Sequence, residues 1–117
     1  DMRDIEDWMA AGDEEAKKAM EVYCYRLKKY IGGYAAVMGG VDVLIFTAGV
    51  GENSPIVREM VCEGLEFLGI KLDKEKNNSR GDAIISAADS KVVVMSIKTN
   101  EELMIARDTY EIVRGLT

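Results

Sequence analysis

The most regular pattern of apolar and polar residues lies between Asp13 and Gly39, where apolar side chains recur every three or four positions. This spacing predicts one long amphipathic helix, with Asp13 as its N-cap and Gly39 and Gly40 at its end. Gly32 and Gly33 interrupt the stripe at about 1 kcal/mol each relative to alanine, so we expect another element to pack closely there. The predicted stripe comprises Ala16, Met20, Tyr23, Leu27, Tyr30 or Ile31, Tyr34 and Met38.

Two apolar runs lack helical spacing and are typical of buried strands. The first runs from Val41 to Phe46 and the second from Lys91 to Ile97, and both are rich in β-branched residues. The segment that links them contains a predicted helix. Such a crossover favours a right-handed parallel strand-helix-strand unit.

A second helix is predicted to begin at Ser54-Pro55, because serine is a good N-cap and proline is a good first helical residue. We expect Gly69 to end this helix. Its buried face is predicted to consist of Ile56, Val57, Met60, Val61, Leu65 and Leu68.

The other elements are shorter. Residues 1–11 are predicted to form a helix with Ile5, Trp8 and Met9 on one face, closed by Gly12. Residues 70–72 and 84–86 are possible short strands, and 73–81 is polar enough for a surface turn or a helical stub.

A last helix is predicted to begin at Thr99-Asn100-Glu101-Glu102, because Thr99 and Glu102 have the spacing of a capping box. Its apolar face would carry Leu103, Ile105 or Ala106, Tyr110 and Val113.

Composition limits the chain to one ordinary globular domain. It has 117 residues, of which 48% are hydrophobic and 31% are charged, and no apolar run has the length needed to span a bilayer. The formal net charge of -6 argues against a nucleic-acid surface, since phosphate backbones are bound by clustered lysine and arginine. We therefore expect neither a membrane nor a nucleic acid as a partner.

The residue types present also restrict the chemistry. Cys24 and Cys62 lack metal-ligand spacing, which favours two reduced, partly buried thiols, and the missing signal peptide points with them to the cytoplasm. Histidine is absent, so the commonest general base at neutral pH is absent too. The chain begins with Asp1 inside a charged helix-like segment, which suggests a piece excised from a longer protein.

The most informative motif follows the first apolar run and directly precedes the Ser54-Pro55 helix. Its two glycines let the backbone approach a ligand, and the helix start offers unpaired N–H groups to an anion. The motif fits neither a Walker A loop nor the dinucleotide fingerprint, so a plain strand-to-helix turn stays an equal alternative to a phosphate site. The octapeptide reads Phe46-Thr47-Ala48-Gly49-Val50-Gly51-Glu52-Asn53.

Glu102 is the carboxylate of greatest interest, because it follows the second predicted strand at the sheet edge expected to hold the glycine turn. A carboxylate there is suited to hold Mg²⁺ against phosphates. On spacing alone, however, the capping role of Glu102 is favoured. The charged residues near the N-terminus, Glu6 and Asp7 among them, are typical of a solvated helix face.

Four sequence blocks, in order, resemble the C-terminal part of the acetate kinase family, and the match covers essentially the whole chain. The resemblance implies an α/β fold, part of a ribonuclease-H-like domain with parallel strands and flanking helices. This is the fold of the superfamily of acetate and sugar kinases, heat-shock chaperones and actin. The blocks are Asp1-Met2-Arg3-Asp4, the octapeptide, Gly64-Leu65-Glu66-Phe67-Leu68-Gly69 and Thr99-Asn100-Glu101-Glu102-Leu103.

The resemblance implies a role for each matching position. In the family the first block contacts the adenosine part of ATP, the glycine loop binds the nucleotide, and the second glutamate of the last block binds Mg²⁺. Residues 1–117 are thus expected to be a C-terminal nucleotide-binding segment. The expected nucleotide ligands are Asp1, Met2, Arg3, Gly49, Val50, Gly51, Glu52 and Asn53, and the expected metal ligand is Glu102.

The resemblance also implies what the segment lacks. The family's asparagine, arginines, aspartate and histidine around acetate and the γ-phosphate do not occur here as blocks, so we expect half of an active site and little activity alone. The implied reaction of the whole protein is reversible transfer of the ATP γ-phosphoryl group to acetate, giving ADP and acetyl phosphate. Propionate or butyrate kinase and a non-catalytic nucleotide-binding module are the alternatives, and a homodimer is expected because family members pair through C-terminal domains.

Overall fold

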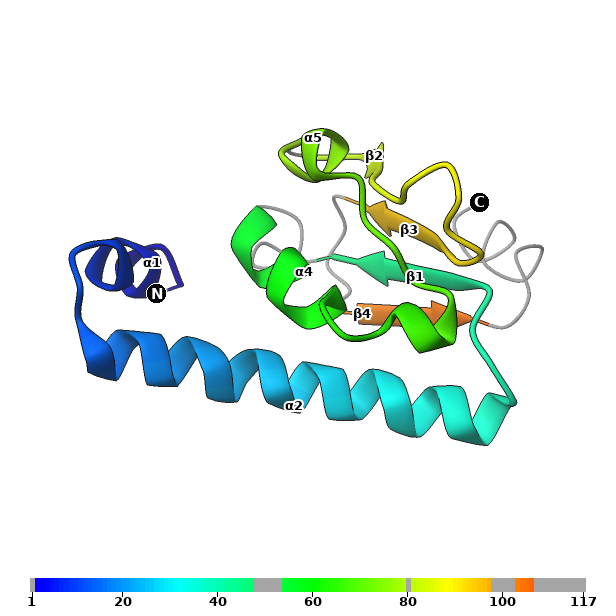
Figure 1. Cartoon of the computed structure of the whole chain (residues 1–117), viewed down its shortest axis with the longest axis horizontal. Coiled ribbons are helices and arrows are strands. Elements are labelled where there is room, and N and C mark those ends of the chain that lie inside the picture. The colour runs from blue at the N-terminus through cyan, green and yellow to red at the C-terminus, as the bar shows by residue number, and fades with distance from the viewer. Residues whose placement is uncertain (1, 48–53, 80, 98–102, 107–117) are drawn as a thin grey trace.

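The computed structural model describes residues 2–47, 54–79, 81–97 and 103–106, with only the backbone described for Met2, Arg3 and 103–106 (Figure 1). The helices are α1 (Met2–Ala10), α2 (Glu14–Met38), α4 (Pro55–Cys62), the short 3-10 helix η1 (Glu66–Leu68) and α5 (Lys74–Asn77). The strands are β1 (Val43–Phe46), β2 (Ala83–Ile84), β3 (Val93–Ser96) and β4 (Leu103–Ala106). Among the described residues, no helix is both long and apolar enough to cross a membrane.

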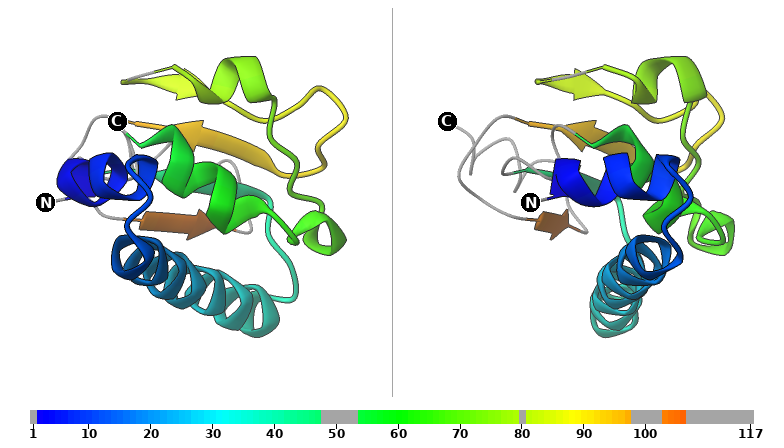
Figure 2. Two further views of the ribbon diagram at one scale, coloured as in Figure 1. Left: turned by 60° about the vertical axis from the view of Figure 1, so that its left-hand side comes forward. Right: turned by 90° about the vertical axis from the view of Figure 1, so that its left-hand side faces the viewer.

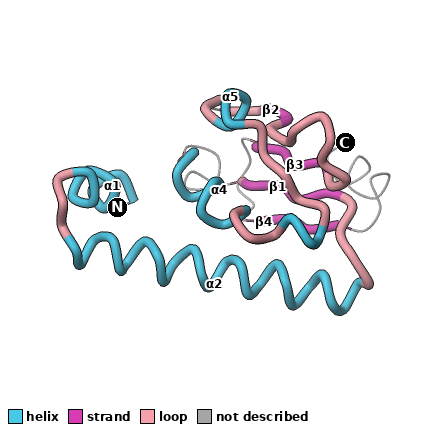
Figure 3. The backbone as a smooth tube through the Cα atoms, in the orientation of Figure 1, coloured by secondary structure: helices cyan, strands magenta, loops and turns pink. Residues whose placement is uncertain are grey.

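The described strands form one mixed sheet in the order β2-β3-β1-β4 (Figure 3). β1 and β3 are parallel, with Val43 opposite Val93 and Phe46 opposite Ser96, as the two apolar runs predicted. β2 and β4 flank this pair and run antiparallel to it. The parallel pair therefore occupies the centre of the sheet, where a strand is covered on both edges.

The prediction of a helix beginning at Thr99 is wrong for residues 103–106. These residues form β4, in which Leu103 lies opposite Phe46 and Ala106 lies opposite Val43. The physical reason is that β1 would otherwise expose a row of unpaired backbone groups along one edge, and the apolar run 103–106 satisfies them. Thr99 and Glu102, the two residues of the predicted capping box, lie outside the described residues. Tyr110 and Val113 lie outside the described residues.

The main core lies between the sheet and helices α2 and α4, which cover one face of it (Figure 2). Leu44 and Phe46 point into this core, whereas Val43 and Ile45 belong to a second cluster with Ile97. Side chains alternate between the faces of a strand, so β1 is buried on both faces, as its unbroken apolar run predicted.

Helix α2 has the predicted caps but a different buried face. The carboxylate of Asp13 accepts hydrogen bonds from the N–H groups of Glu15 and Ala16, and Gly39 ends the helix in the left-handed conformation. Of the two alternatives in the predicted stripe, Ile31 is buried and Tyr30 is exposed. Tyr23 and Tyr34, expected in the core or at an interface, are exposed in this chain, and the core positions of α2 are Ala16, Met20, Cys24, Ile31 and Ala35.

The two glycines inside α2 do not mark a close approach of another element. A Cβ atom added to Gly32 or Gly33 would have no neighbour within 4 Å among the residues that the structure describes. The expectation of tight packing at these positions is therefore wrong. Both glycines simply leave α2 less stable than alanine would.

Helix α4 begins where predicted and ends earlier. It runs from Pro55 to Cys62, and Gly64 then takes a φ of +86°, which ends the helix before η1. Val57, Val61 and Leu65 are buried as predicted, but Ile56 is exposed. Short strands were predicted at 70–72 and 84–86. The structure has only an isolated bridge between Leu72 and Ser86 and the two-residue strand β2 in these regions.

Gly69→Ala is expected to destabilise the fold, because Gly69 has a φ of +90° and a Cβ atom there would lie 2.9 Å from Cβ of Lys91. We expect the free energy of unfolding to fall by about 2 kcal/mol or more, from backbone strain and overpacking. Urea denaturation measures this change in the free energy of unfolding. Gly33→Ala is the control, with an expected gain of roughly 1 kcal/mol in an open helical position. A Gly69→Ala protein as stable as the unmutated one contradicts the described turn.

Candidate functional site

The carboxyl ends of the two central strands meet at one edge of the sheet. Phe46 pairs with Ser96 and with Leu103, and the N–H of Ile97 donates to the carbonyl oxygen of Phe46 at 2.9 Å. The segment after β1 and the segment between β3 and β4 therefore begin side by side. Ligands of open α/β sheets bind at such an edge, and the predicted glycine turn and Glu102 belong to these two segments.

Most of the predicted ligands fall in parts of the chain that the structure does not describe. Met2 and Arg3 are described only as backbone positions in the first turn of α1. The roles of all these residues stay predictions. The residues outside the described ranges are Asp1, Gly49, Val50, Gly51, Glu52, Asn53 and Glu102.

The start of α4 is built as the sequence predicted. Ser54 is 4% exposed, has extended backbone angles and accepts the N–H of Val57 through its hydroxyl at 3.2 Å. Pro55 occupies the first helical position, where its missing N–H costs nothing. The remaining N–H groups of the first turn and the positive end of the helix dipole favour an anion at this helix start.

Glu6 joins α1 to the start of α4, a role that sequence reasoning missed. The Ser54 hydroxyl donates a hydrogen bond to Oε1 of Glu6, which is partly buried. The interpretation of Glu6 as part of a solvated face is therefore wrong. The bond holds α1 beside the start of α4 (Figure 2). Met2 and Arg3 lie about one turn from Glu6 along α1. Only the separation of 48 positions hid this contact from the sequence.

Thr47 is the second residue that sequence reasoning passed over. It follows β1 directly and is 2% exposed, yet its Oγ1 atom has no hydrogen-bond partner in the part of the chain that the structure describes. An unsatisfied buried hydroxyl costs about 1–3 kcal/mol. The position right after a buried strand was the signal that could have identified it. Its hydroxyl is suited to donate to an oxygen of a ligand at the sheet edge.

The two thiols are not nucleophiles of a site. Burial raises the pKa of Cys62 to about 12, against the opposing effect of the Lys28 ammonium. Burial likewise raises the pKa of Cys24 to about 11, again partly offset by Lys28. Both cysteines are buried and free, as predicted. At neutral pH they are protonated core residues.

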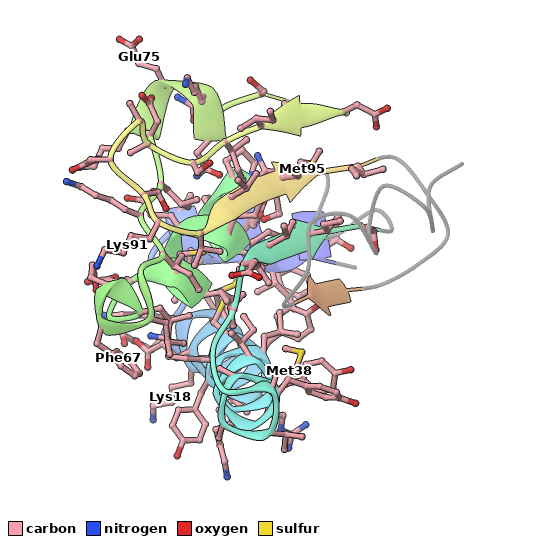
Figure 4. The ribbon with its side chains drawn as sticks, turned by 90° about the vertical axis from the view of Figure 1, so that its right-hand side faces the viewer. Lys18, Met38, Phe67, Glu75, Lys91 and Met95 are labelled. Carbon is pink, nitrogen blue, oxygen red and sulfur yellow. The ribbon has the colours of Figure 1, made fainter. Side chains whose placement is uncertain are left out.

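The described residues offer no competing metal centre, but they line hollows elsewhere on the surface. No group of three or more cysteine, aspartate and glutamate side chains suited to a metal occurs among them. A hollow of about 400 Å³ is lined by 66–71 and 89–91, and Lys71 and Asp89 form an exposed ion pair of 2.7 Å there. Figure 4 shows Phe67 and Lys91 at this end of the sheet and Met95 towards the other. The hollow lies at the amino end of β3, away from the capped start of α4.

Comparison with known families and proteins gives one consistent answer. The sequence model of the Acetokinase family matches residues 1–107. The chain is 64% identical over 119 residues to acetate kinase of Thermotoga maritima, covering 99% of this chain and 30% of that protein. It is 62% identical over 114 residues to acetate kinase of Carboxydothermus hydrogenoformans, covering 97% of this chain and 29% of that protein. The chain thus spans about three tenths of the length of these curated relatives.

Solved structures agree with the sequence relatives. The fold matches acetate kinase of Porphyromonas gingivalis with a TM-score of 0.80 and 52% identity, over 85% of this chain and 25% of that one. It matches a propionate kinase of Francisella tularensis with a TM-score of 0.77 and 35% identity, over 87% of this chain and 26% of that one. The predicted fold class, an α/β segment of the acetate and sugar kinase, heat-shock chaperone and actin superfamily, is confirmed.

The contact between Glu6 and Ser54 predicts energetic coupling between α1 and α4. Ser54→Ala removes both the cap of α4 and the hydrogen bond that the Ser54 hydroxyl donates to Glu6, so we expect a loss of about 1–2 kcal/mol in the free energy of unfolding. A double-mutant cycle of Ser54→Ala with Glu6→Ala should show a coupling of about 1 kcal/mol. Asp7→Ala is the control, because Asp7 is an exposed acidic residue next to Glu6. It should show no coupling energy with Ser54→Ala. Equal coupling for both acidic residues contradicts the described bond.

The buried thiols predict a loss of stability at alkaline pH. Their folded-state pKa values of about 11 and 12 lie above the ordinary value of 9.0, so folding favours the protonated form. Their contribution is complete below pH 9 and is lost as the pH rises from 9 towards 12. Urea midpoints measured from pH 7 to 10.5 should fall at the alkaline end, and less so in Cys62→Ala. Rapid labelling of Cys62 in the folded protein at pH 8 contradicts this.

Proposed function

Since this chain belongs to the acetokinase family, we propose that it is the C-terminal nucleotide-binding segment of an acetate kinase. The whole protein transfers the γ-phosphoryl group of ATP to acetate, and the reaction is reversible. One carboxylate oxygen of acetate forms a bond to Pγ, and the bond from Pγ to the bridging oxygen of ADP breaks. The products are acetyl phosphate and ADP.

The observation that carries the proposal is the capped start of α4 beside the carboxyl end of the central strands. Pro55 has no N–H and the Ser54 hydroxyl accepts that of Val57, so the N–H of Ile56 and the positive end of the helix dipole are what this helix start offers to an anion, and β1 and β3 end at the same edge. The buried hydroxyl of Thr47 lies next to this edge without a partner among the described residues. A bound phosphate oxygen, or a water on Mg²⁺, would satisfy it.

We assign the nucleotide contacts to three segments that lead to this place. The turn from Gly49 to Asn53 receives the phosphates, because it connects β1 to the capped helix start. Asp1, Met2 and Arg3 receive the adenosine, and the bond from Ser54 to Glu6 supports this by holding α1 at the same helix start. Glu102 holds Mg²⁺, since it directly precedes β4 at the same edge. When bound, Mg²⁺ neutralises the charge that develops on the transferring phosphoryl group.

The acceptor side belongs to residues outside this chain. Phosphoryl transfer needs positive charge around the transferring group and a fixed position for the nucleophile. The described residues offer the dipole and the backbone N–H at the start of α4, which suit a phosphate oxygen of the donor. The relatives are more than three times longer than this chain. We therefore expect the 117 residues to bind nucleotide and to be inactive alone.

Propionate kinase is the alternative that a specific observation favours. The propionate kinase of Francisella tularensis shares this fold segment at 35% identity, nearly the value for the acetate kinase of Entamoeba histolytica at 33%. Acyl-chain length is thus not decided by the part of the chain compared here, and butyrate is open for the same reason. Steady-state rates of the full-length protein with acetate, propionate and butyrate separate these substrates.

We further propose that the full-length protein is a homodimer. The support is an unusual exposure of large apolar and aromatic side chains along α2, where Tyr25 is 61% and Val37 is 86% exposed. Tyr30 and Tyr34 add a pair of rings 4.6 Å apart on the same helix. Exposed apolar surface of this kind favours a protein partner. Light scattering of the full-length protein gives its mass directly.

The proposed donor site makes Glu102 and Gly49 sensitive positions in the full-length protein. We expect Glu102→Gln to lower acetate-dependent ADP formation by about 100-fold, since the charge on the metal is lost. Gly49→Ala should raise the KM for ATP about tenfold by blocking the approach of the phosphates. Glu101→Gln is the matched control and should change neither value more than about twofold. Unchanged activity in Glu102→Gln contradicts the metal assignment, and no ATP-dependent activity in the unmutated protein contradicts the proposed function.

A further inference from the structure

Helix α4 carries a guanidinium group that is completely removed from solvent. Arg58 is 0% exposed, and its Nε donates to Oδ1 of Asn77 at 2.8 Å. Its Nη2 donates to the backbone carbonyl oxygens of Asn77 and of Ser79, the latter at 2.9 Å. A buried cation is tolerated only where its donors are satisfied in good geometry. Arg58 therefore binds the segment around α5 firmly to α4.

Asn77 returns a hydrogen bond to the same helix. Its Nδ2 donates to the carbonyl oxygen of Pro55 at 3.0 Å, and the residue itself is 4% exposed. Positions 55 and 58 are three apart, so they lie on one face of α4 about one turn from each other. One buried amide thus contacts both ends of the first turn of α4 and makes use of both its oxygen and its nitrogen.

The first turn of α4 is consequently held from two sides. Glu6 of α1 receives the Ser54 hydroxyl on one side, and Asn77 of α5 contacts Pro55 and Arg58 on the other. Such restraint exceeds what an eight-residue helix needs for burial, since Val57 and Val61 already anchor it in the core. Restraint of the first turn matters for electrostatics, because the attraction of a helix start for an anion is confined to that turn and depends on its direction.

We propose that Asn77, together with Arg58, is a positioning clamp that sets the direction of the α4 start towards the phosphates of the nucleotide. The inference rests on the proposed function. Asn77 acts through Pro55 and Arg58 and touches no reacting atom. Movement of the helix start by a fraction of an ångström lengthens its hydrogen bonds to the phosphate oxygens and therefore weakens the binding of the nucleotide.

Asn77→Asp tests the clamp in the full-length protein. The aspartate keeps an acceptor for Nε of Arg58 and loses the donor to Pro55, so the packing of Arg58 is retained while the helix start is released. We expect the KM for ATP to rise about fivefold, with kcat and the KM for acetate within about twofold of the unmutated values. Asn78→Asp, which makes the same charge change at the exposed next residue, is the matched control and should leave all three constants unchanged.

The split between the two KM values separates positioning from plain stability. A purely structural role for Asn77 would lower the melting temperature and leave the KM for ATP of the folded enzyme unchanged, and that result overturns the clamp. Equal rises in both KM values overturn it as well. If Asn77→Asp does not fold, Asn77→Ser, which is too short to reach both partners, must give the same rise for ATP alone. An unmutated protein without ATP-dependent activity contradicts the proposed function itself.

Discussion

Strand β1 is the element on which the rest of the structure depends, because it is buried on both faces and paired along both edges. Its four residues are 0–1% exposed, with Leu44 and Phe46 on the helix side and Val43 and Ile45 on the other. All backbone polar groups of such a strand must be paired with neighbouring strands, since no water reaches them. This requirement brings β3 parallel to one edge and β4 antiparallel to the other.

The same requirement brings the candidate site together. Because β1 and β3 are parallel in register, the segments that leave them begin at the same edge, and β4 starts there because it is antiparallel. The start of α4 then lies at this edge with the positive end of its dipole. Sheet topology and the dipole of α4 are thus the features that support the proposed nucleotide site in a chain that has no histidine and an acidic net charge.

Local signals were read correctly at the starts of α2 and α4 and at the end of α2. The Asp13 and Ser54 caps each involve side-chain to backbone bonds over two or three residues, and Gly39 ends α2 by its own left-handed conformation. Such bonds follow from residue type and spacing alone. The tyrosines of α2 show the limit of this reasoning. Tyr23 and Tyr34 fit the apolar period as well as Met20 does, but the neighbouring α4 and sheet cover a different side of the helix.

The sequence by itself determined the helix caps, the two central strands and the family, because these depend on local spacing and on ordered blocks of residues. Only the tertiary structure decided that Leu103–Ala106 is a strand and that Glu6 contacts Ser54. It also decided that Asn77 connects Pro55 to Arg58. Each of these depends on a partner far away in the chain, and an apolar run or a polar side chain carries no sign of which partner it will meet. The unpaired edge of β1, not the propensity of 103–106, selected the strand.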